Sequence, residues 1–336
     1  TPRRSRMLDV DNIPRPAWDL IPLENYLAGG YSYGVNIGRT IPVIATRGCP
    51  YQCTFCSNPL MWTTRWLART PSKVVDEMQE YIAKYNIQNF DFYDLTAVVR
   101  KDWIMEFCQL LIGRNLNITW QLPSGTRSEA LDDEVTDLLY RSGCRNLTYA
   151  PESGSVETLK RIKKKINPDR MIASMKCAIR NKINIKANII VGFPGEKLKD
   201  ILATYKFIMR MATVGVDDVS VWTFSAYPGS EIFRDLQNQK RLPEFDDEYF
   251  YSLLSYSDLK NVISWNENFS STRLKYLRIL GLVLFYATRY TLKPHCFFRT
   301  LRNLIMHKPE SRLEMIVEKS TSRHSKSENC PKLKQE

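Results

Sequence analysis

Three cysteines stand close together near the start of the chain. Cys49, Cys53 and Cys56 have the spacing C-x3-C-x2-C and directly follow an apolar run at residues 41–45. A [4Fe–4S] cluster has four irons and is usually held by four cysteines, so three close ligands would leave one iron open to another molecule. An open coordination position is typical of a catalytic metal site, whereas structural sites are closed. The spacing therefore predicts a cluster that takes part in chemistry.

Two other interpretations are open for these thiols. They could join a distant fourth cysteine around a zinc ion, although the chain has no second C-x2-C pair. They could also be core thiols, because free cysteine is often buried. Gly48 and Pro50 let the chain bend sharply and favour a metal-binding loop. The other cysteines are scattered singly, at Cys108, Cys144, Cys177, Cys296 and Cys330.

The composition is that of an ordinary globular protein. The chain has 336 residues, of which 43% are hydrophobic and 25% are charged, and this length allows one or two domains. Its eight cysteines are not spaced as a disulfide framework, which favours a reducing compartment, so we expect a cytoplasmic protein. No apolar segment follows the basic N-terminus, so the sequence shows no signal peptide. The chain does not begin with Met, and we expect it to be part of a longer protein.

Half of the net charge of +12 lies at the C-terminus. Residues 289–336 hold eleven Lys or Arg against five Asp or Glu. Such an excess is typical of contact with nucleic acid or an anionic membrane, or of a solvated tail. The uncharged run at residues 279–288 is well below the roughly 20 residues that a membrane span needs. We expect it in a buried or interfacial helix.

Apolar and helical segments alternate between residues 41 and 225. Short apolar runs predict strands at residues 41–46, 89–94, 118–122, 146–150, 185–191 and 218–225. Amphipathic patterns predict helices at residues 71–85, 101–112, 132–142, 156–162, 169–181 and 197–214. This alternation predicts an α/β fold with a parallel sheet. A doubly wound sheet would carry a glycine-rich loop where this chain has the cysteines. We therefore predict a partial (β/α)6 TIM-like barrel, which places its chemistry at the carboxyl ends of the strands.

The predicted domains follow from the same pattern. Residues 1–40 read as an irregular lead-in from an upstream domain, and residues 41–240 form the barrel. Residues 241–319 are aromatic-rich, with helices expected at 272–291 and 296–306, and form a C-terminal helical cap over the barrel mouth. Residues 320–336 are polar and lysine-rich, which predicts a disordered basic tail.

Polar residues at the strand ends are candidate ligands. Asp94 could accept hydrogen bonds from an ammonium group or cap the following turn. Arg127 could pair with a carboxylate or be a solvated loop charge. Glu152 and Ser153, in the segment A-P-E-S-G-S, could bind ribose hydroxyls or an amine, and helix capping by serine is the alternative.

The fifth and sixth strands run into glycine-containing turns. Gly192 and Gly195 bound the segment G-F-P-G, where an exposed backbone could read the edge of an adenine, and Y-P-G-S follows the sixth strand at residues 227–230. Taken in order, the cysteine loop, the acidic turn, E-S-G-S, G-F-P-G-E and Y-P-G-S resemble the barrel of the radical S-adenosylmethionine (radical SAM) enzymes. The resemblance covers residues 13–233 and includes an aromatic, Phe55, directly before the last cysteine.

The resemblance is nearest to the branch whose members carry an N-terminal cobalamin domain, such as the anaerobic magnesium-protoporphyrin ester cyclase and many C-methyltransferases. The segment P-R-P-A-W-D-L at residues 14–20 looks like the link between the two domains of that branch. Where the family usually has Gly-Gly-Glu after the second strand, this chain has Y-D-L at residues 93–95. The histidines stand in no D-x-H-x2-G cobalamin motif, and they are His295, His307 and His324.

The resemblance implies an enzyme that holds a [4Fe–4S] cluster through Cys49, Cys53 and Cys56. Such an enzyme cleaves SAM reductively and uses the 5′-deoxyadenosyl radical for methylation, cyclisation or rearrangement at a C–H bond. The likeness also implies an electron donor such as flavodoxin or ferredoxin, a small-molecule or lipid substrate, and cobalamin in a domain outside this chain. The residues that it assigns to SAM are Phe55, Asp94, Arg127, Glu152, Ser153, Asn188, Gly192 and Gly195.

Two rival functions are open. A cluster protein for electron transfer would carry four cysteine ligands, and this loop has three. An RNA-modifying methylthiotransferase has a similar barrel, but usually adds an N-terminal three-cysteine domain and a C-terminal RNA-binding barrel, whereas this C-terminus reads as helical. We therefore do not expect nucleic acid as a partner, and we expect that the basic C-terminal region could touch a membrane surface.

Overall fold

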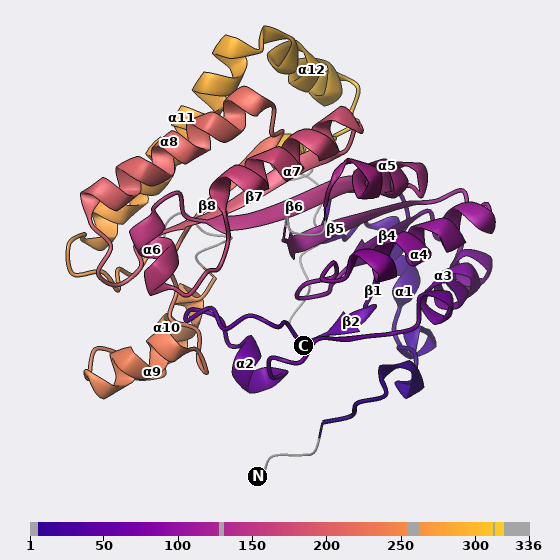
Figure 1. Cartoon of the computed structure of the whole chain (residues 1–336), viewed down its shortest axis with the longest axis horizontal. Coiled ribbons are helices and arrows are strands. Elements are labelled where there is room, and N and C mark those ends of the chain that lie inside the picture. The colour runs from indigo at the N-terminus through magenta and orange to yellow at the C-terminus, as the bar shows by residue number, and fades with distance from the viewer. Residues whose placement is uncertain (1–5, 128–130, 255–261, 312, 319–336) are drawn as a thin grey trace, which may run out of the picture.

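The computed structural model describes residues 6–127, 131–254, 262–311 and 313–318. It shows one sheet of six parallel strands with helices packed against it (Figure 1). In spatial order the strands are β1 (Thr40–Val43), β4 (Asn89–Phe92), β5 (Thr119–Thr126), β6 (Cys144–Glu152), β7 (Asn184–Val191) and β8 (Asp218–Thr223). Two further short strands form an antiparallel pair, β2 (Thr46–Arg47) with β3 (Leu67–Ala68).

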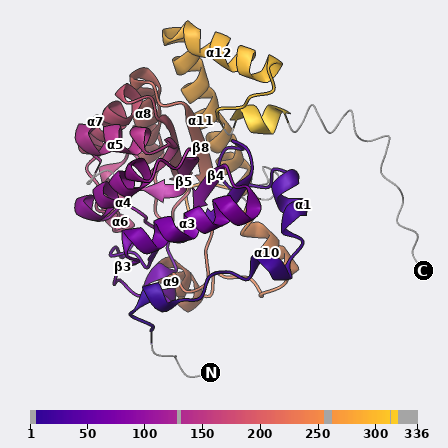
Figure 2. The same ribbon diagram turned by 90° about the vertical axis from the view of Figure 1, so that its right-hand side faces the viewer.

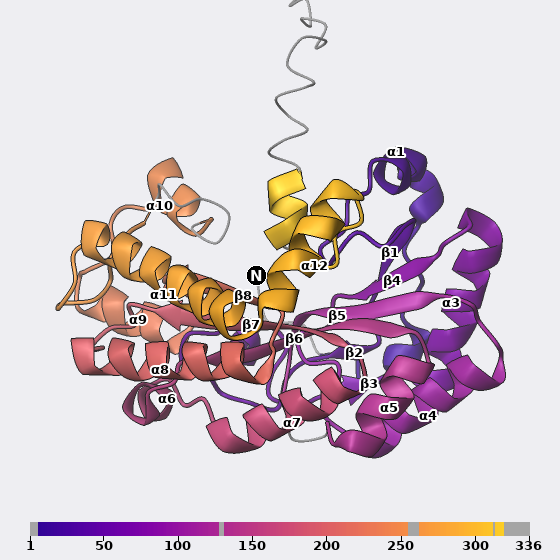
Figure 3. The ribbon, with the colours of Figure 1, turned by 90° about the horizontal axis from the view of Figure 1, so that it is seen from above.

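Helices connect each strand of the large sheet to the next. They are α3 (Pro71–Tyr85), α4 (Lys101–Gly113), α5 (Asp133–Arg141), α6 (Val156–Arg161), α7 (Pro168–Arg180) and α8 (Leu198–Val214). From above, most of this helical layer lies on one face of the sheet (Figure 3). Within the described residues β8 does not pair with β1, so the sheet stays open. The fold is thus the partial (β/α)6 TIM-like barrel that the sequence predicted.

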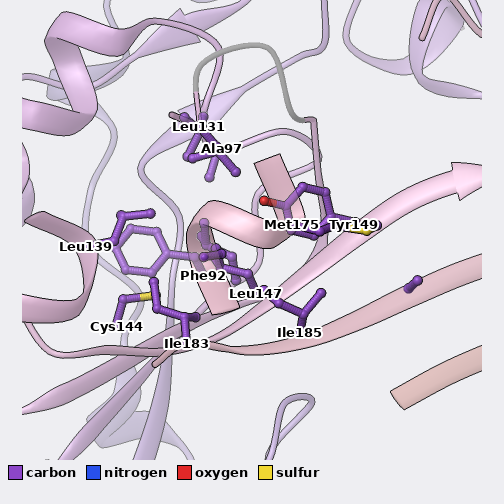
Figure 4. Close-up of a cluster of buried hydrophobic side chains, with 14 of the residues drawn as sticks. Phe92, Ala97, Leu131, Leu139, Cys144, Leu147, Tyr149, Met175, Ile183 and Ile185 are labelled. Atoms are coloured by element: carbon purple, nitrogen blue, oxygen red, sulfur yellow. The ribbon is translucent and has the colours of Figure 1, made fainter. Parts of the chain in front are cut away.

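The main core lies between the sheet and these helices. In β7, Ile185 and Ile189 are buried on the helix side, whereas Lys186 and Asn188 are half-buried on the inner face of the sheet. Leu147 of β6 packs in the same layer (Figure 4). This alternation follows from the period of two along a strand, and it leaves polar side chains on the inner face, where a barrel holds its ligands.

The lead-in is more regular than we predicted. It contains two short 3-10 helices, η1 (Val10–Asn12) and η2 (Trp18–Leu20), and the helix α1 (Leu23–Ala28). It then crosses the inner face, where the backbone N–H groups of Tyr33 and Gly34 donate to Asp91 over 3.1 and 2.9 Å. The N–H group of Val35 donates to Gln121 over 3.0 Å. Buried polar groups of β4 and β5 need hydrogen-bond partners, and the lead-in backbone supplies them.

The C-terminal helices occupy two ends of the molecule. They are α9 (Glu231–Asn238), α10 (Asp247–Ser252), α11 (Ser271–Leu292) and α12 (Pro294–Ile305). The Tyr249 hydroxyl of α10 donates to the Ala226 carbonyl, three residues after β8, over 2.6 Å, so α10 lies at the carboxyl edge of the sheet. In contrast, α11 runs along α8 and β8, and Arg278 donates to Val221 over 2.7 Å. The predicted tail, residues 320–336, lies outside the described residues.

Gly143, which follows the end of α5, lies very close to the backbone of a neighbouring segment. Its φ is +101°, and a Cβ there would lie 2.3 Å from the carbonyl oxygen of Ile118. We expect Gly143→Ala to lower the free energy of unfolding by about 2 kcal/mol or more, because a left-handed backbone alone costs roughly 1–2 kcal/mol. Gly113 is the matched control, since a Cβ there meets nothing within 4 Å. Urea unfolding followed by circular dichroism measures both, and equal effects would contradict this account.

Candidate active site

The three cysteines lie in one loop between β2 and the short helix α2 (Asn58–Met61). All three thiols are free and half-buried. The loop turns back on itself, because the Cys56 N–H donates to the Cys53 carbonyl over 3.1 Å and the Asn58 amide donates to the Cys49 carbonyl over 3.2 Å. Gly48 has a φ of +84°, and a Cβ there would lie 2.4 Å from the Arg65 carbonyl oxygen. A glycine is therefore required where the chain enters the loop.

Other segments fix this loop at the carboxyl edge of the sheet. The Thr54 N–H donates to the carbonyl of Ile162 after α6, and the Ile232 N–H of α9 donates to the Thr54 carbonyl, both over 3.0 Å. The Ser57 hydroxyl donates to the Pro228 carbonyl over 2.7 Å. The loop is thus tied to the segments that follow β6 and β8. This explains how a loop without long secondary structure can hold three thiols in fixed places.

The thiols influence one another. Burial raises the pKa of Cys53 and Cys56, and the neighbouring cysteines raise it further. A metal that binds them must therefore displace the protons, which makes binding dependent on pH. Among the described residues no three His, Cys, Asp or Glu side chains converge on a single metal ion, as a zinc site requires. A [4Fe–4S] cluster takes one thiolate at each iron, so three free thiols in one loop fit a cluster with one open iron.

Glu152 and Lys164 form a buried ion pair beside the loop. Their side chains are 2.9 Å apart, and each is 8% exposed. Burial alone would lower the pKa of Lys164, but Glu152 and the nearby Cys53 raise it above its usual value. Glu152 has a φ of +64°, and such a conformation costs energy and is concentrated at functional sites. Lys164 is not among the residues predicted above, because three consecutive lysines at residues 163–165 look alike in the sequence and only the structure shows that Lys164 is buried.

Arg127 and Phe55 also pack at the cysteine loop. The Arg127 guanidinium lies 3.4 Å from the centre of the Tyr51 ring, and it donates to the Lys165 carbonyl. The Phe55 and Phe193 rings are 5.5 Å apart. The structure therefore brings both predicted residues together with Glu152 and the cysteines.

Asp94 lies under the loop rather than open to a ligand. It is buried and accepts hydrogen bonds from the backbone of Ala45 over 3.3 Å and from the Thr46 hydroxyl over 2.5 Å. Burial raises the pKa of Asp94 to about 6. Its oxygens thus hold the chain where it leaves β1. This placement favours an anchoring role, close to the turn-capping alternative, over contact with a cofactor.

Ser153, Gly192 and Gly195 likewise make contacts within the fold. The Ser153 hydroxyl lies 3.0 Å from the Thr204 hydroxyl of α8. The Gly192 N–H donates to Glu196 over 2.6 Å, and the Gly195 N–H donates to Glu267 over 2.8 Å. The backbone donors that could have read an adenine are therefore engaged with carboxylates of the chain.

A cavity of about 390 Å³ lies on the inner face of the sheet. Its walls include Phe55, Lys186, Asn188, Trp222, Thr223 and Tyr227. The Asn188 side-chain oxygen and the Thr223 hydroxyl are buried and have no hydrogen-bond partner, and the same holds for the hydroxyls of Thr54 and Thr126. Buried polar atoms rarely stay unpaired, so this inner face fits a polar ligand next to the cysteine loop.

Comparison with known proteins identifies the class. Residues 43–208 match the radical SAM superfamily domain, and the chain belongs to that superfamily. It is 28% identical over 251 residues to a cytidylyl-2-hydroxyethylphosphonate methyltransferase of Streptomyces wedmorensis, covering 71% of this chain and 46% of the relative. It is 26% identical over 259 residues to the anaerobic magnesium-protoporphyrin IX monomethyl ester cyclase of Rubrivivax gelatinosus, covering 77% and 45%. The chain thus spans about half the length of these relatives.

Solved structures show the same fold. The methyltransferase TsrM of Kitasatospora setae, with cobalamin and a [4Fe–4S] cluster bound, superposes with a TM-score of 0.55 at 18% identity, covering 71% of this chain and 43% of that one. The cobalamin-dependent radical SAM enzyme OxsB superposes with a TM-score of 0.54 at 14% identity, covering 86% and 50%. Enzymes of the superfamily use a [4Fe–4S] cluster and SAM, and the cysteine loop and the unpaired polar atoms fit these groups.

The cluster assignment predicts a specific loss of iron. After anaerobic reconstitution we expect about four irons per chain, and we expect Cys53→Ala to lose most of the iron and the broad visible absorbance. Cys177→Ala is the control, because Cys177 is also half-buried but lies on α7, away from the loop. Iron analysis and absorbance spectra measure both. Full iron in Cys53→Ala, or equal loss in Cys177→Ala, would overturn the assignment.

Glu196, in the turn after β7, should make the stability of the protein depend on pH. Burial raises the pKa of Glu196 from 4.5 to about 7, so between these values the folded chain keeps a proton that the unfolded chain has lost. Stability should therefore fall as pH rises from about 4.5 to about 7, by up to roughly 3 kcal/mol from this group. Glu196→Gln should flatten that slope, while the exposed Glu244→Gln should not. Urea titrations at several pH values test this, and an unchanged slope in Glu196→Gln would contradict it.

Proposed function

We propose that this chain is the catalytic barrel of a radical SAM enzyme that functionalises a C–H bond by methylation, cyclisation or rearrangement. One observation carries the proposal: three free, half-buried thiols stand in one loop at the carboxyl edge of the sheet, next to a cavity with unpaired buried polar atoms. Bound there, a [4Fe–4S] cluster and SAM would supply the 5′-deoxyadenosyl radical after one-electron reduction. A small electron donor such as flavodoxin or ferredoxin would provide that electron.

The residues of the chain would bind and orient the cofactors. Cys49, Cys53 and Cys56 would hold the cluster. Lys164 and Glu152 lie beside Cys53 and carry the opposite charges that the carboxylate and the ammonium group of an amino acid require. The two groups already form an ion pair, so the charge of each is balanced before a ligand arrives.

The cavity would hold the rest of SAM and the substrate. Asn188 and Thr223 offer polar atoms without a protein partner, and Phe55, Trp222 and Tyr227 provide aromatic walls. Aromatic walls exclude water and so protect a reactive species from side reactions. The protein then supplies position and shielding, while the cofactor supplies the chemistry.

We further propose that the full-length enzyme uses cobalamin. The support is that the similar proteins include methyltransferases and that the similar structures hold cobalamin. The chain spans about half of these relatives, and its own histidines lie outside a cobalamin motif. Cobalamin would therefore be held by a part of the protein outside this chain. The substrate would be a small molecule or a lipid.

Removing the negative charge of the Glu152–Lys164 ion pair should weaken the binding of SAM. In reconstituted protein, Glu152→Gln should weaken SAM binding by about 1.5–3 kcal/mol, the usual worth of a hydrogen bond to a charged group. Ser153→Ala is the control, because its hydroxyl contacts Thr204 on the helix side. Equilibrium binding of SAM and formation of 5′-deoxyadenosine with dithionite measure the effect. Iron content must stay at the wild-type level in both variants. Unchanged SAM affinity in Glu152→Gln would show that Glu152 stabilises the fold and does not bind SAM.

A further inference from the structure

The helix α12 carries an apolar stripe that faces solvent. Its members are Phe297 (48% exposed), Phe298 (65%), Leu301 (45%), Ile305 (68%) and, just after the helix, Met306 (58%). Phe298, Leu301 and Ile305 stand three and four residues apart, which places these three on one side of the helix. Phe297 and Met306 border that side. Ile316, in the short helical segment 313–318, is 56% exposed as well. Contiguous apolar patches of this kind are rare on soluble monomers and mark interaction sites.

The opposite side of α12 is already used for packing. Cys296 and Asn303 are its buried residues, and the Asn303 amide lies 3.3 Å from the Glu314 carboxylate. Turning the helix to hide the stripe would break these contacts and expose the buried ones. In two perpendicular views α12 lies at the opposite end of the molecule from α9 and α10 (Figures 1 and 2). The stripe is therefore remote from the cysteine loop.

The charged residues of α12 itself are all basic. Helix α12 itself contains no Asp or Glu. Arg302 and Lys308 are exposed, and in the described part of the chain neither forms an ion pair. The carboxylates nearby follow the helix: Glu310 pairs with Arg299 at 3.8 Å, Glu318 lies 3.1 Å from His307, and Glu314 accepts from the Glu310 N–H over 2.7 Å.

We propose that α12 docks this end of the protein onto an anionic lipid surface. Helices that lie in a membrane interface combine an apolar face with Lys and Arg, and anionic lipids attract the basic residues. No described helix is long and apolar enough to cross a bilayer, so the contact is peripheral. A second copy of the chain is a poorer partner, because a twofold interface would place the basic rims of both copies against each other.

Docking through α12 would leave the active site open. The cysteine loop contacts α9 at the far end of the molecule, so the reductant and substrate could reach it while α12 lies on lipid. The docking surface consists of the stripe with Arg302 and Lys308, and its binding to lipid does not depend on the proposed reaction.

Vesicle sedimentation tests the proposal on the 336-residue chain. We expect binding to vesicles of phosphatidylcholine with a quarter phosphatidylglycerol, weak binding to phosphatidylcholine alone, and loss at high salt. Removing both charges in Arg302→Gln/Lys308→Gln should weaken binding about fivefold per residue. Phe298→Ser/Ile305→Ser should weaken it about tenfold or more, because two apolar side chains no longer enter the interface.

A matched variant distinguishes the stripe from exposed apolar surface in general. Tyr276 and Val283 on α11 are 66% and 54% exposed, so Tyr276→Ser/Val283→Ser removes similar surface elsewhere and should bind as the wild type does. Thermal unfolding checks that all variants fold. Equal binding to neutral vesicles, no binding at all, or equal loss in the α11 variant would overturn the proposal. A concentration-dependent dimer lost in Phe298→Ser/Ile305→Ser, without vesicle binding, would assign the stripe to self-association instead.

Discussion

The backbone of the cysteine loop is held by hydrogen bonds from separate βα units, and the candidate site depends on that constraint. Parallel strands bring their carboxyl ends to one edge of the sheet, so the segments after β6 and β8 reach the same loop. Ile162 and Ile232 fix Thr54 from two sides, and Asp94 fixes Thr46 from below. The thiols need no long helix or strand of their own, because the sheet places everything that contacts them.

Buried ionisable groups do much of this positioning. Asp94 and Glu196 accept hydrogen bonds from backbone at the ends of β1 and β7, and burial raises the pKa of both. Leaving such groups unpaired would cost free energy, so each one specifies the conformation of its turn. The pair of Glu152 and Lys164 differs, because it lies beside the cysteines. The same kind of interaction thus serves the fold in two places and the candidate site in a third.

The sequence predicted the order and type of the sheet elements, because apolar runs with period two and amphipathic runs with period 3.6 depend on local spacing. It also located the cysteine loop, whose ligands are close in the chain. It could not show that Asp94 would contact Thr46 or that Gly192 would contact Glu196, since both residue types are also typical of ordinary turns and these partners are set by the tertiary fold. Nor could it place α11 along α8, because buried arginines such as Arg278 interrupt its apolar face.

Electron paramagnetic resonance of the reconstituted, dithionite-reduced chain tests the central claim most directly. The account predicts the signal of a reduced [4Fe–4S] cluster, and it predicts that SAM changes this signal, because three cysteine ligands leave one iron open to it. A signal that is identical with and without saturating SAM would show that no iron is open. A spectrum from isolated iron, without a cluster, would contradict the claim that the three cysteines hold a [4Fe–4S] cluster.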